Sequence, residues 1–277
     1  MNPILLRPRL ALAPLLLAFA LPARALVEEV PFVVTPDSVT QAMLELARVG
    51  PGDHVIDLGS GDGRIVITAA KRFGASGLGV EIDPALVAKS IENARAAGVD
   101  GKVRFIEQDL FKTDLDPATV VTLYLLPEVN LKLRPSLLAL KPGTRIVSHD
   151  WDMAEWQPDR TIVLDVPDKA VGLEKKSKVH FWVVPARIQG DWCGTGKARG
   201  VLLRLAQEFQ RFRGRFEAPG AEPQDFSGRI EGPLAASPKH VNIRLQGGGK
   251  LQVQAISKAY SKVHAGIFVP ARGPECK

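Results

Sequence analysis

The sequence predicts an α/β protein in which a doubly wound, mostly parallel seven-stranded sheet is followed by a small β-rich C-terminal domain. Between residues 35 and 148, short apolar segments alternate with segments of helical periodicity. Two further strands, within 161–184, have no helical segment between them, which predicts an antiparallel pair at the sheet edge. Beyond Pro185, apolar runs are separated by glycine- and proline-rich turns, a pattern typical of short antiparallel strands.

The first domain is expected to open with a helix in which Thr35 is the N-cap, Pro36 the first helical residue and Asp37 an acid in the first turn. Strands are then expected at 54–58, 77–82, 103–107, 119–125, 145–148, 161–166 and 179–184. Helices are expected at about 64–73, 84–97 and 130–140. Strands that alternate with helices form a parallel sheet, and such a sheet binds ligands at the carboxyl ends of its strands.

The second domain is expected to span residues 187–277, after a first domain at 26–186. Strands are predicted at 228–231, 240–246 and 250–257. The apolar spacing of 201–216 fits either strands or a helix, so this stretch stays open.

Residues 1–25 have the layout of a secretory signal peptide. Arg7 and Arg9 precede an apolar run at 10–21, and Ala23-Arg24-Ala25 offers a small-residue cleavage site. The run is shorter than the roughly 20 residues of a membrane-spanning helix. We expect cleavage after Ala25 and an exported protein, periplasmic or secreted; the alternative is an uncleaved membrane anchor.

Composition and charge narrow the class of protein. The chain has 277 residues, 45% hydrophobic and 24% charged, which is typical of a globular protein and excludes wholesale disorder. The net charge of +6 is unevenly distributed, because residues 26–186 hold 18 basic and 23 acidic residues whereas 187–277 hold 15 and seven. The basic C-terminal region is either a solvated surface or a surface for an anionic partner such as a membrane.

Strand alternation would place Arg211, Arg213 and Arg215 on one face of the C-terminal domain. This face would suit anionic lipid head groups or an acidic protein. Nucleic acid is not expected as a partner of an exported protein.

A glycine-rich turn follows the first expected strand, with glycines at 59, 61 and 63. Glycine permits a sharp turn and lets a ligand touch the backbone. The G-x-G-x-G spacing differs from the G-x-G-x-x-G of dinucleotide-binding proteins. Glu81 ends the next strand, where a carboxylate can accept two ribose hydroxyls, and Asp109 follows the third, where it can accept a hydrogen bond from an adenine amine.

Together these residues resemble the class I S-adenosylmethionine-dependent methyltransferases over residues 31–186, which implies a Rossmann-like fold and S-adenosylmethionine as cofactor. In that resemblance Asp57 and the three glycines flank the methionine part of the cofactor, Glu81 matches the ribose acid and Asp109 the adenine-side acid. The segments PFVVTPDSVTQAML and DLGSGDGRIVITAAK are similar to a narrower group, the lysine methyltransferase-like family that modifies ATP synthase c-subunit and adenine nucleotide translocase. This likeness implies that Thr35 lies at the carboxylate end of the cofactor. The full set expected to bind the cofactor is Thr35, Asp57, Gly59, Ser60, Gly61, Gly63, Glu81, Ile82, Asp109 and Leu110.

The acceptor side departs from the family pattern. Nitrogen-directed methyltransferases often carry an Asn/Asp-Pro-Pro-aromatic motif after the fourth strand, whereas this chain has Tyr-Leu-Leu-Pro at 124–127. Tyr124, Asn130 and Asp150 are the candidate catalytic residues, and ordinary packing is the favoured interpretation of Trp151 and Trp156. The predicted function is methyl transfer to a protein lysine or other amine of an envelope component. The alternative is an exported binding module that keeps the pocket without turnover and docks to an anionic envelope partner.

Cysteine and histidine usage adds one further expectation. Cys193 and Cys276 lie at opposite ends of the C-terminal domain and are predicted to form a disulfide in an oxidising compartment, with two free thiols as the alternative. The five histidines are scattered without zinc-site spacing, so no metal is expected.

Overall fold

The computed structural model describes residues 32–170, 174–256, 265–273 and 276. The predicted signal peptide and cleavage site lie outside the described residues. None of the helices in the described ranges is long and apolar enough to cross a membrane.

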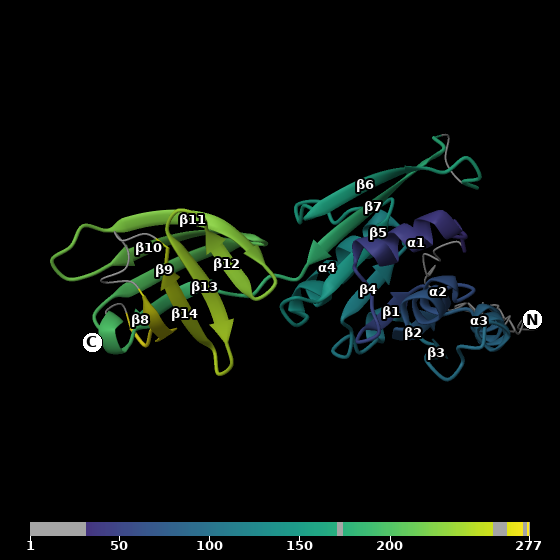
Figure 1. Cartoon of the computed structure of the whole chain (residues 1–277), viewed down its shortest axis with the longest axis horizontal. Helices are drawn as coiled ribbons and strands as arrows, with labels where there is room; N and C mark the ends of the chain where they lie inside the picture. Colours follow the sequence, from purple (N-terminus) through teal and green to yellow (C-terminus); the bar gives the residue numbers. More distant parts are fainter. Residues whose placement is uncertain (1–31, 171–173, 257–264, 274–275, 277) are drawn as a thin grey trace, which may run out of the picture. The chain divides into compact units, whose positions relative to one another are not determined.

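The first domain is built on a seven-stranded sheet with the order β3-β2-β1-β4-β5-β7-β6 (Figure 1). Its strands are β1 (His54–Leu58), β2 (Ser76–Glu81), β3 (Val103–Glu107), β4 (Val120–Leu123), β5 (Arg145–His149), β6 (Arg160–Asp165) and β7 (Lys176–Val183). The first five pair in parallel, and β7 is antiparallel to both β5 and β6. The predicted fold class is therefore confirmed, including the antiparallel edge pair.

Helix α1 (Asp37–Leu46) precedes β1, and three helices connect parallel strands: α2 (Arg64–Phe73), α3 (Pro84–Ala96) and α4 (Pro127–Ala139). The prediction that Thr35 caps α1 is wrong, because the N-cap is the extended Pro36, whose carbonyl accepts from Thr40 N at 2.9 Å. Helix α4 begins three residues earlier than expected, since Pro127 suits the first turn of a helix, where its missing N–H costs nothing.

Apolar clusters pack these helices on the sheet. Val39, Met43 and Leu44 of α1 are fully buried in one cluster with sheet residues such as Val120 and Val147. A second cluster joins the buried faces of α2 and α3 to β3; its fully or nearly buried members include Val66, Ala70, Ala94, Val103 and Phe105. This packing holds the strand ends, and the loops that follow them, in place.

The C-terminal domain is a closed eight-stranded antiparallel barrel in which neighbours in sequence are neighbours in space (Figure 1). Its strands are β8 (Gly190–Gly194), β9 (Leu202–Glu208), β10 (Arg211–Glu217), β11 (Gln224–Glu231), β12 (Leu234–Ser237), β13 (Val241–Gln246), β14 (Lys250–Ala255) and β15 (Gly266–Pro270). The pairing of β15 with β8 closes the ring. Residues 201–216, whose spacing fitted either strands or a helix, form the two strands β9 and β10. Phe209 and Gln210 join them, and Phe209 has a φ of 50°.

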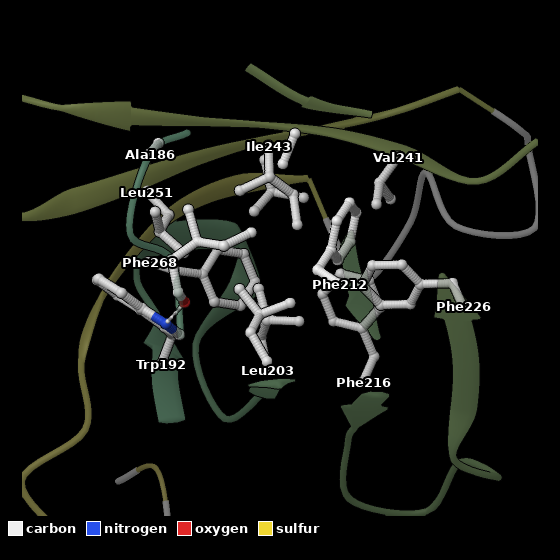
Figure 2. Close-up of a cluster of buried hydrophobic side chains, with 14 of the residues drawn as sticks. Ala186, Trp192, Leu203, Phe212, Phe216, Phe226, Val241, Ile243, Leu251 and Phe268 are labelled. Carbon is white, nitrogen blue, oxygen red and sulfur yellow. Dashed lines mark hydrogen bonds between the residues drawn. The ribbon is translucent and has the colours of Figure 1, made fainter. Parts of the chain in front are cut away.

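The barrel interior is filled by its own side chains. Aromatic and aliphatic residues from all parts of the ring point toward one another, among them Leu203, Phe216, Ile243 and Phe268, each no more than 1% exposed (Figure 2). The indole nitrogen of Trp192 donates to Ile188 O at 2.9 Å, so the largest core side chain keeps a hydrogen-bond partner. A partner of this domain would therefore meet its outer surface.

The structure joins Cys193 of β8 to Cys276 in a disulfide, with a Cα–Cα distance of 5.3 Å. The bridge spans 83 residues of sequence and ties the end of the chain to the first strand of the barrel. In the chain-entropy model a loop of this length stabilises the folded state by roughly 4 kcal/mol.

Candidate active site

The glycine-rich loop between β1 and α2 takes a conformation that other residues rarely adopt. Gly59, Gly61 and Gly63 have φ values of 75°, 52° and 81°. The amides of Gly59 and Ser60 both donate to Val80 O of the neighbouring strand at 2.9 Å. A side chain on Gly61 would overlap the ring of Phe32. The loop is thus a tightly wound glycine cradle whose left-handed backbone favours glycine. Gly59 is exposed, whereas Gly61 and Gly63 are buried.

Glu81 connects this loop to the end of β2. One carboxylate oxygen accepts from Gly61 N at 2.9 Å, and the other accepts from Ile82 N at 2.8 Å and Asp83 N at 3.1 Å. A carboxylate has about four acceptor positions, so these three hydrogen bonds orient the group and leave capacity for a hydroxyl. The structure therefore brings together the glycine motif and the predicted ribose acid, which are 20 residues apart in sequence.

Asp57, the last but one residue of β1, lies beneath the loop and is only 2% exposed. Burial, together with the charges of Glu81 and Asp62, raises the pKa of its carboxyl from 3.8 to about 7, against the opposing effect of a 2.6 Å hydrogen bond from Thr122. A buried carboxyl that titrates near neutral pH responds strongly to a cation placed beside it.

On the third strand, Asp109 has one oxygen engaged as the cap of a short 3₁₀ turn, where it accepts from Phe111 N at 2.9 Å. Its other oxygen lies 3.7 Å from Lys112 Nζ. Leu110 is half-buried, whereas Ile82 is 54% and Phe111 51% exposed. Exposed apolar side chains beside these two acids suit the faces of a planar heterocycle, and Phe111 is a candidate that the sequence analysis missed.

The segment before α1 is fastened to the glycine loop by Arg64. Its guanidinium donates to Thr35 O at 3.0 Å and to both carboxylate oxygens of Asp62, and it lies 3.5 Å from Asp37. Thr35 is 5% exposed, so it is held against the loop by its backbone. No motif pointed to the contact of Arg64 with Thr35, because the fold brings together these two residues, which are 29 positions apart.

Tyr124, immediately after β4, stacks on His149 at the end of β5, with ring centroids 3.9 Å apart. Burial and the charge of Asp150 raise the pKa of the Tyr124 hydroxyl. Burial lowers the pKa of His149, which is therefore a neutral imidazole at physiological pH. Tyr124 is half-buried, and its hydroxyl has no hydrogen-bond partner within the described part of the chain.

Asp150 is already committed to contacts within the protein. One carboxylate oxygen accepts from Lys169 Nζ at 2.7 Å and the other from Lys178 N at 3.0 Å. Its backbone has a φ of 63°, which is costly for a residue other than glycine. Asp150 therefore anchors the segment between β6 and β7 to the end of β5, which is a positioning role.

Asn130 is fully buried and holds the backbone of Trp151. Its amide nitrogen donates to Ser148 Oγ at 3.2 Å and to Trp151 O at 3.3 Å, while Ser148 Oγ donates to the same carbonyl at 2.6 Å. The indole of Trp151 is 44% exposed, so packing is the wrong interpretation for this residue. It is correct for Trp156, which is fully buried.

The exposed apolar side chains share one location. Among the described residues, most of the large apolar side chains that face solvent lie before α1 or in the connections that follow β2 to β5. They are Phe32, Val34, Ile82, Phe111, Leu131 and Trp151. Of these, Phe32 lies directly against the glycine loop at Gly61, and Trp151 follows β5, at the carboxyl ends of the strands where parallel sheets bind ligands.

Comparison with known proteins identifies this arrangement. Residues 57–160 match the family model described as the ANTKMT methyltransferase domain. A protein-lysine N-methyltransferase of Saccharolobus islandicus is 44% identical over 141 residues, which cover 50% of this chain and 88% of that protein. The mouse adenine nucleotide translocase lysine N-methyltransferase is 36% identical over 131 residues, which cover 47% of this chain and 57% of its own length. The chain thus spans little more than half the length of that mouse relative.

A solved structure agrees with these relatives. The crystal structure of an RNA methyltransferase from Salinibacter ruber, in complex with S-adenosyl-L-homocysteine, is 53% identical. It covers 56% of this chain and 96% of that one, with a TM-score of 0.51. The glycine cradle, the oriented Glu81 carboxylate and the exposed Ile82 and Phe111 fit the same cofactor skeleton, so the residues present suit S-adenosylmethionine. The chain belongs to the S-adenosylmethionine-dependent protein-lysine N-methyltransferase family.

Proposed function

We propose that this protein methylates lysine side chains of an exported or envelope protein. The observation that carries the proposal is the cofactor half of the site, where Glu81 is held against Gly61 by a 2.9 Å hydrogen bond, in a chain 44% identical to a protein-lysine N-methyltransferase. The choice of an exported or envelope protein as the methyl acceptor is part of this proposal.

The proposed location is outside the cytoplasm. Two observations support it: the leader-like residues 1–25, and the disulfide between Cys193 and Cys276. Disulfides persist in oxidising compartments and are rare in the cytosol. S-adenosylmethionine must then be supplied to that compartment.

The chemistry asks the protein mainly to position the acceptor. S-adenosylmethionine, when bound, supplies a methyl group already activated on a sulfonium. The acceptor lysine must arrive as a neutral amine with its lone pair free. Tyr124 keeps its proton at neutral pH because its pKa is raised, so it is not a base. Its hydroxyl oxygen accepts a hydrogen bond from an amine N–H, which orients the nitrogen and leaves the lone pair free for the methyl group.

Trp151 is proposed to cover the aliphatic part of the lysine. Its indole is 44% exposed while its backbone carbonyl is fixed by Asn130 and Ser148. A rigid aromatic face packs against the methylenes of lysine and leaves its amine free. Trp151 thus serves binding, whereas Tyr124 serves orientation.

An RNA acceptor is a second candidate, because the 53% identical structure from Salinibacter ruber is named an RNA methyltransferase. The test is transfer of radiolabelled methyl from S-adenosylmethionine by protein beginning at Leu26, offered envelope protein fractions and total RNA separately. Label in protein, located by mass spectrometry on lysine, supports the proposal; label in RNA alone overturns it. Tyr124→Phe should lower kcat by about tenfold with cofactor affinity unchanged.

An anionic membrane surface is proposed as a partner of the C-terminal domain, on the basis of its net charge of +8. The arginine face expected on β10 is exposed as alternation requires, but acids are interleaved with it. Arg204 lies 3.0 Å from Asp191 and 3.1 Å from Glu217, and Arg215 lies 2.7 Å from Asp225. The face that carries the positive charge is therefore a separate question.

A further inference from the structure

We infer that the outer face of strands β12–β14, and not the arginine face of β9–β11, is the surface with which the barrel binds anionic phospholipid. This inference rests on the proposed membrane partner of the C-terminal domain and is independent of the methyltransferase activity. It is carried by the distribution of charge around the barrel, by the strand register and by one exposed aliphatic side chain.

The two halves of the barrel differ in charge at the level of sequence. Residues 202–231, which form β9–β11, hold five arginines and five acidic residues. Residues 232–274 hold six basic residues and no acid. About one residue in nine of the whole chain is acidic, so a stretch of 43 residues would ordinarily contain four or five acids. The excess charge of the domain therefore lies on the second half.

The strand register places the polar side chains of this half on one face. Arg244 pairs with Leu234 on one side and Gln252 on the other, and Gln246 pairs with Lys250. The intervening residues Ile243, Leu251 and Val253 are buried in the core, so their neighbours point outward. We define the amide–basic face as Asn242, Arg244, Gln246, Lys250, Gln252 and Gln254.

This face is free to bind a partner. Arg244 and Lys250 are exposed and have no ion pair with any residue that the structure describes. On the other half Arg204 and Arg215 are paired with acids, and Arg211 and Arg213, which have no such pair in the described residues, lie in a stretch with five acidic residues. Cations without acidic neighbours create a potential of one sign, which attracts phosphate groups. The amides of Gln252 and Gln254 add neutral hydrogen-bond donors for the same oxygens.

An exposed isoleucine at the edge of the face favours lipid over other polyanions. Ile256 is 48% exposed, and its amide donates to His240 O at 2.7 Å, next to the exposed Lys239. An aliphatic side chain beside basic residues suits the boundary between head groups and acyl chains. Single-stranded nucleic acid would instead require exposed aromatic rings for stacking, and none of the six side chains of the amide–basic face is aromatic.

The test is flotation of the full-length mature protein with vesicles of phosphatidylcholine, alone or mixed with phosphatidylglycerol. We expect binding only to the mixed vesicles, weakened by salt. The double variant Arg244→Glu/Lys250→Glu should lose at least about tenfold in partition coefficient, because each cation near an anionic surface contributes about fivefold. Ile256→Ser should lose about threefold, in a part of the binding that salt does not affect.

The matched control is Arg211→Glu/Arg213→Glu, which makes the same change in net charge on the opposite half. It should lose less than about twofold, because charges farther from the membrane than about 8 Å are screened. Equal losses in both double variants would overturn the choice of face. Failure of the wild-type protein to bind mixed vesicles, or tighter binding to RNA than to vesicles, would overturn the membrane partner.

Cofactor binding by the same variants shows whether membrane binding is independent of the methyltransferase site. Cofactor affinity, measured by calorimetry on each variant, should equal that of the wild-type protein. A variant with a lower melting temperature is replaced by Arg244→Gln/Lys250→Gln, for which a loss of at least about fivefold is expected.

Discussion

The two halves of the active-site edge are constructed differently. In the cofactor half, after β1–β3, the ligand-facing groups are backbone amides and acids that follow directly from short sequence motifs, and Glu81 reaches Gly61 through one hydrogen bond. In the acceptor half, after β4 and β5, the groups are held by side chains that belong to no recognisable motif, as Lys169 holds Asp150 and Asn130 holds Trp151. Contacts about 20 residues apart in sequence shape both halves, but only the cofactor half is marked by motifs. A family that keeps its cofactor and varies its acceptors can be expected to divide in this way.

The largest effect is expected from Gly61→Val. The residue has a φ of 52°, and a β-branched side chain there would overlap Phe32 and fill the cofactor's space. Affinity for S-adenosylmethionine, measured by calorimetry, should fall by more than about 100-fold. Gly98→Val is the control, because Gly98 has a φ of 68° but faces open space. The Gly98→Val variant should be less stable than the wild-type protein but should bind S-adenosylmethionine with the same affinity. Similar affinities for the two variants would mean that strain, and not contact, explains the loss.

Glu81→Ala should weaken cofactor binding by about 10- to 100-fold, since a hydrogen bond to a charged group contributes roughly 1.5–3 kcal/mol. The control is Glu107→Ala, because Glu107 pairs with Glu81 across β2 and β3 but has no hydrogen bond to the glycine loop in the described residues. Unchanged affinity in a folded Glu81→Ala protein would remove this residue from the ribose site.

Cofactor affinity should rise by up to about tenfold per pH unit as the pH approaches 7 from below, and then level off. The pKa of Asp57 is raised to about 7, so its carboxyl binds a proton below that pH, and a cationic cofactor must displace the proton. Without cofactor the sign for stability is the reverse: the unfolding free energy falls as the pH rises from about 3.8 to about 7. Asp57→Asn should flatten both profiles, and a wild-type affinity independent of pH would contradict the assignment.

The smallest effect is expected in the acceptor half. Trp151→Ala should raise KM for the acceptor by about fourfold, the value of one lysine methylene buried against the ring, with cofactor affinity and kcat nearly unchanged. Asn130→Ala should act in the same direction but less, because Ser148 still donates to the Trp151 carbonyl. Val163→Ala is the control, because Val163 is an exposed apolar residue on the edge strand; this variant should change neither KM, kcat nor cofactor affinity. A loss of cofactor affinity in the Trp151 variant would erase the distinction between the two halves.

Much of the first domain was predictable because its signals are local. Strands β1 and β3 and helix α2 begin and end at the predicted residues, and the glycines, Glu81 and Asp57 meet at the edge where parallel strands place them. The contacts of Arg64 with Thr35 and of Lys169 with Asp150 were not predictable, because neither pair belongs to a motif. The exposure of Trp151 also escaped prediction, because an aromatic residue after a strand is equally consistent with packing.

By itself, the sequence determined the parallel sheet with its antiparallel edge, the cofactor, the family and the uneven charge of the chain. The sheet follows from hydrophobic periodicity and the charge from residue counts, whereas the cofactor and the family follow from the resemblance carried by the glycine and acid motifs. The tertiary structure alone decided that the C-terminal strands close into a barrel, since β8, β12 and β15 are four or five residues long and gain their stability from distant partners. It also decided which charges are neutralised: Arg204 and Arg215 form ion pairs with acids on neighbouring strands, whereas Arg244 and Lys250 form none with the described residues, and only pairing in space distinguishes them.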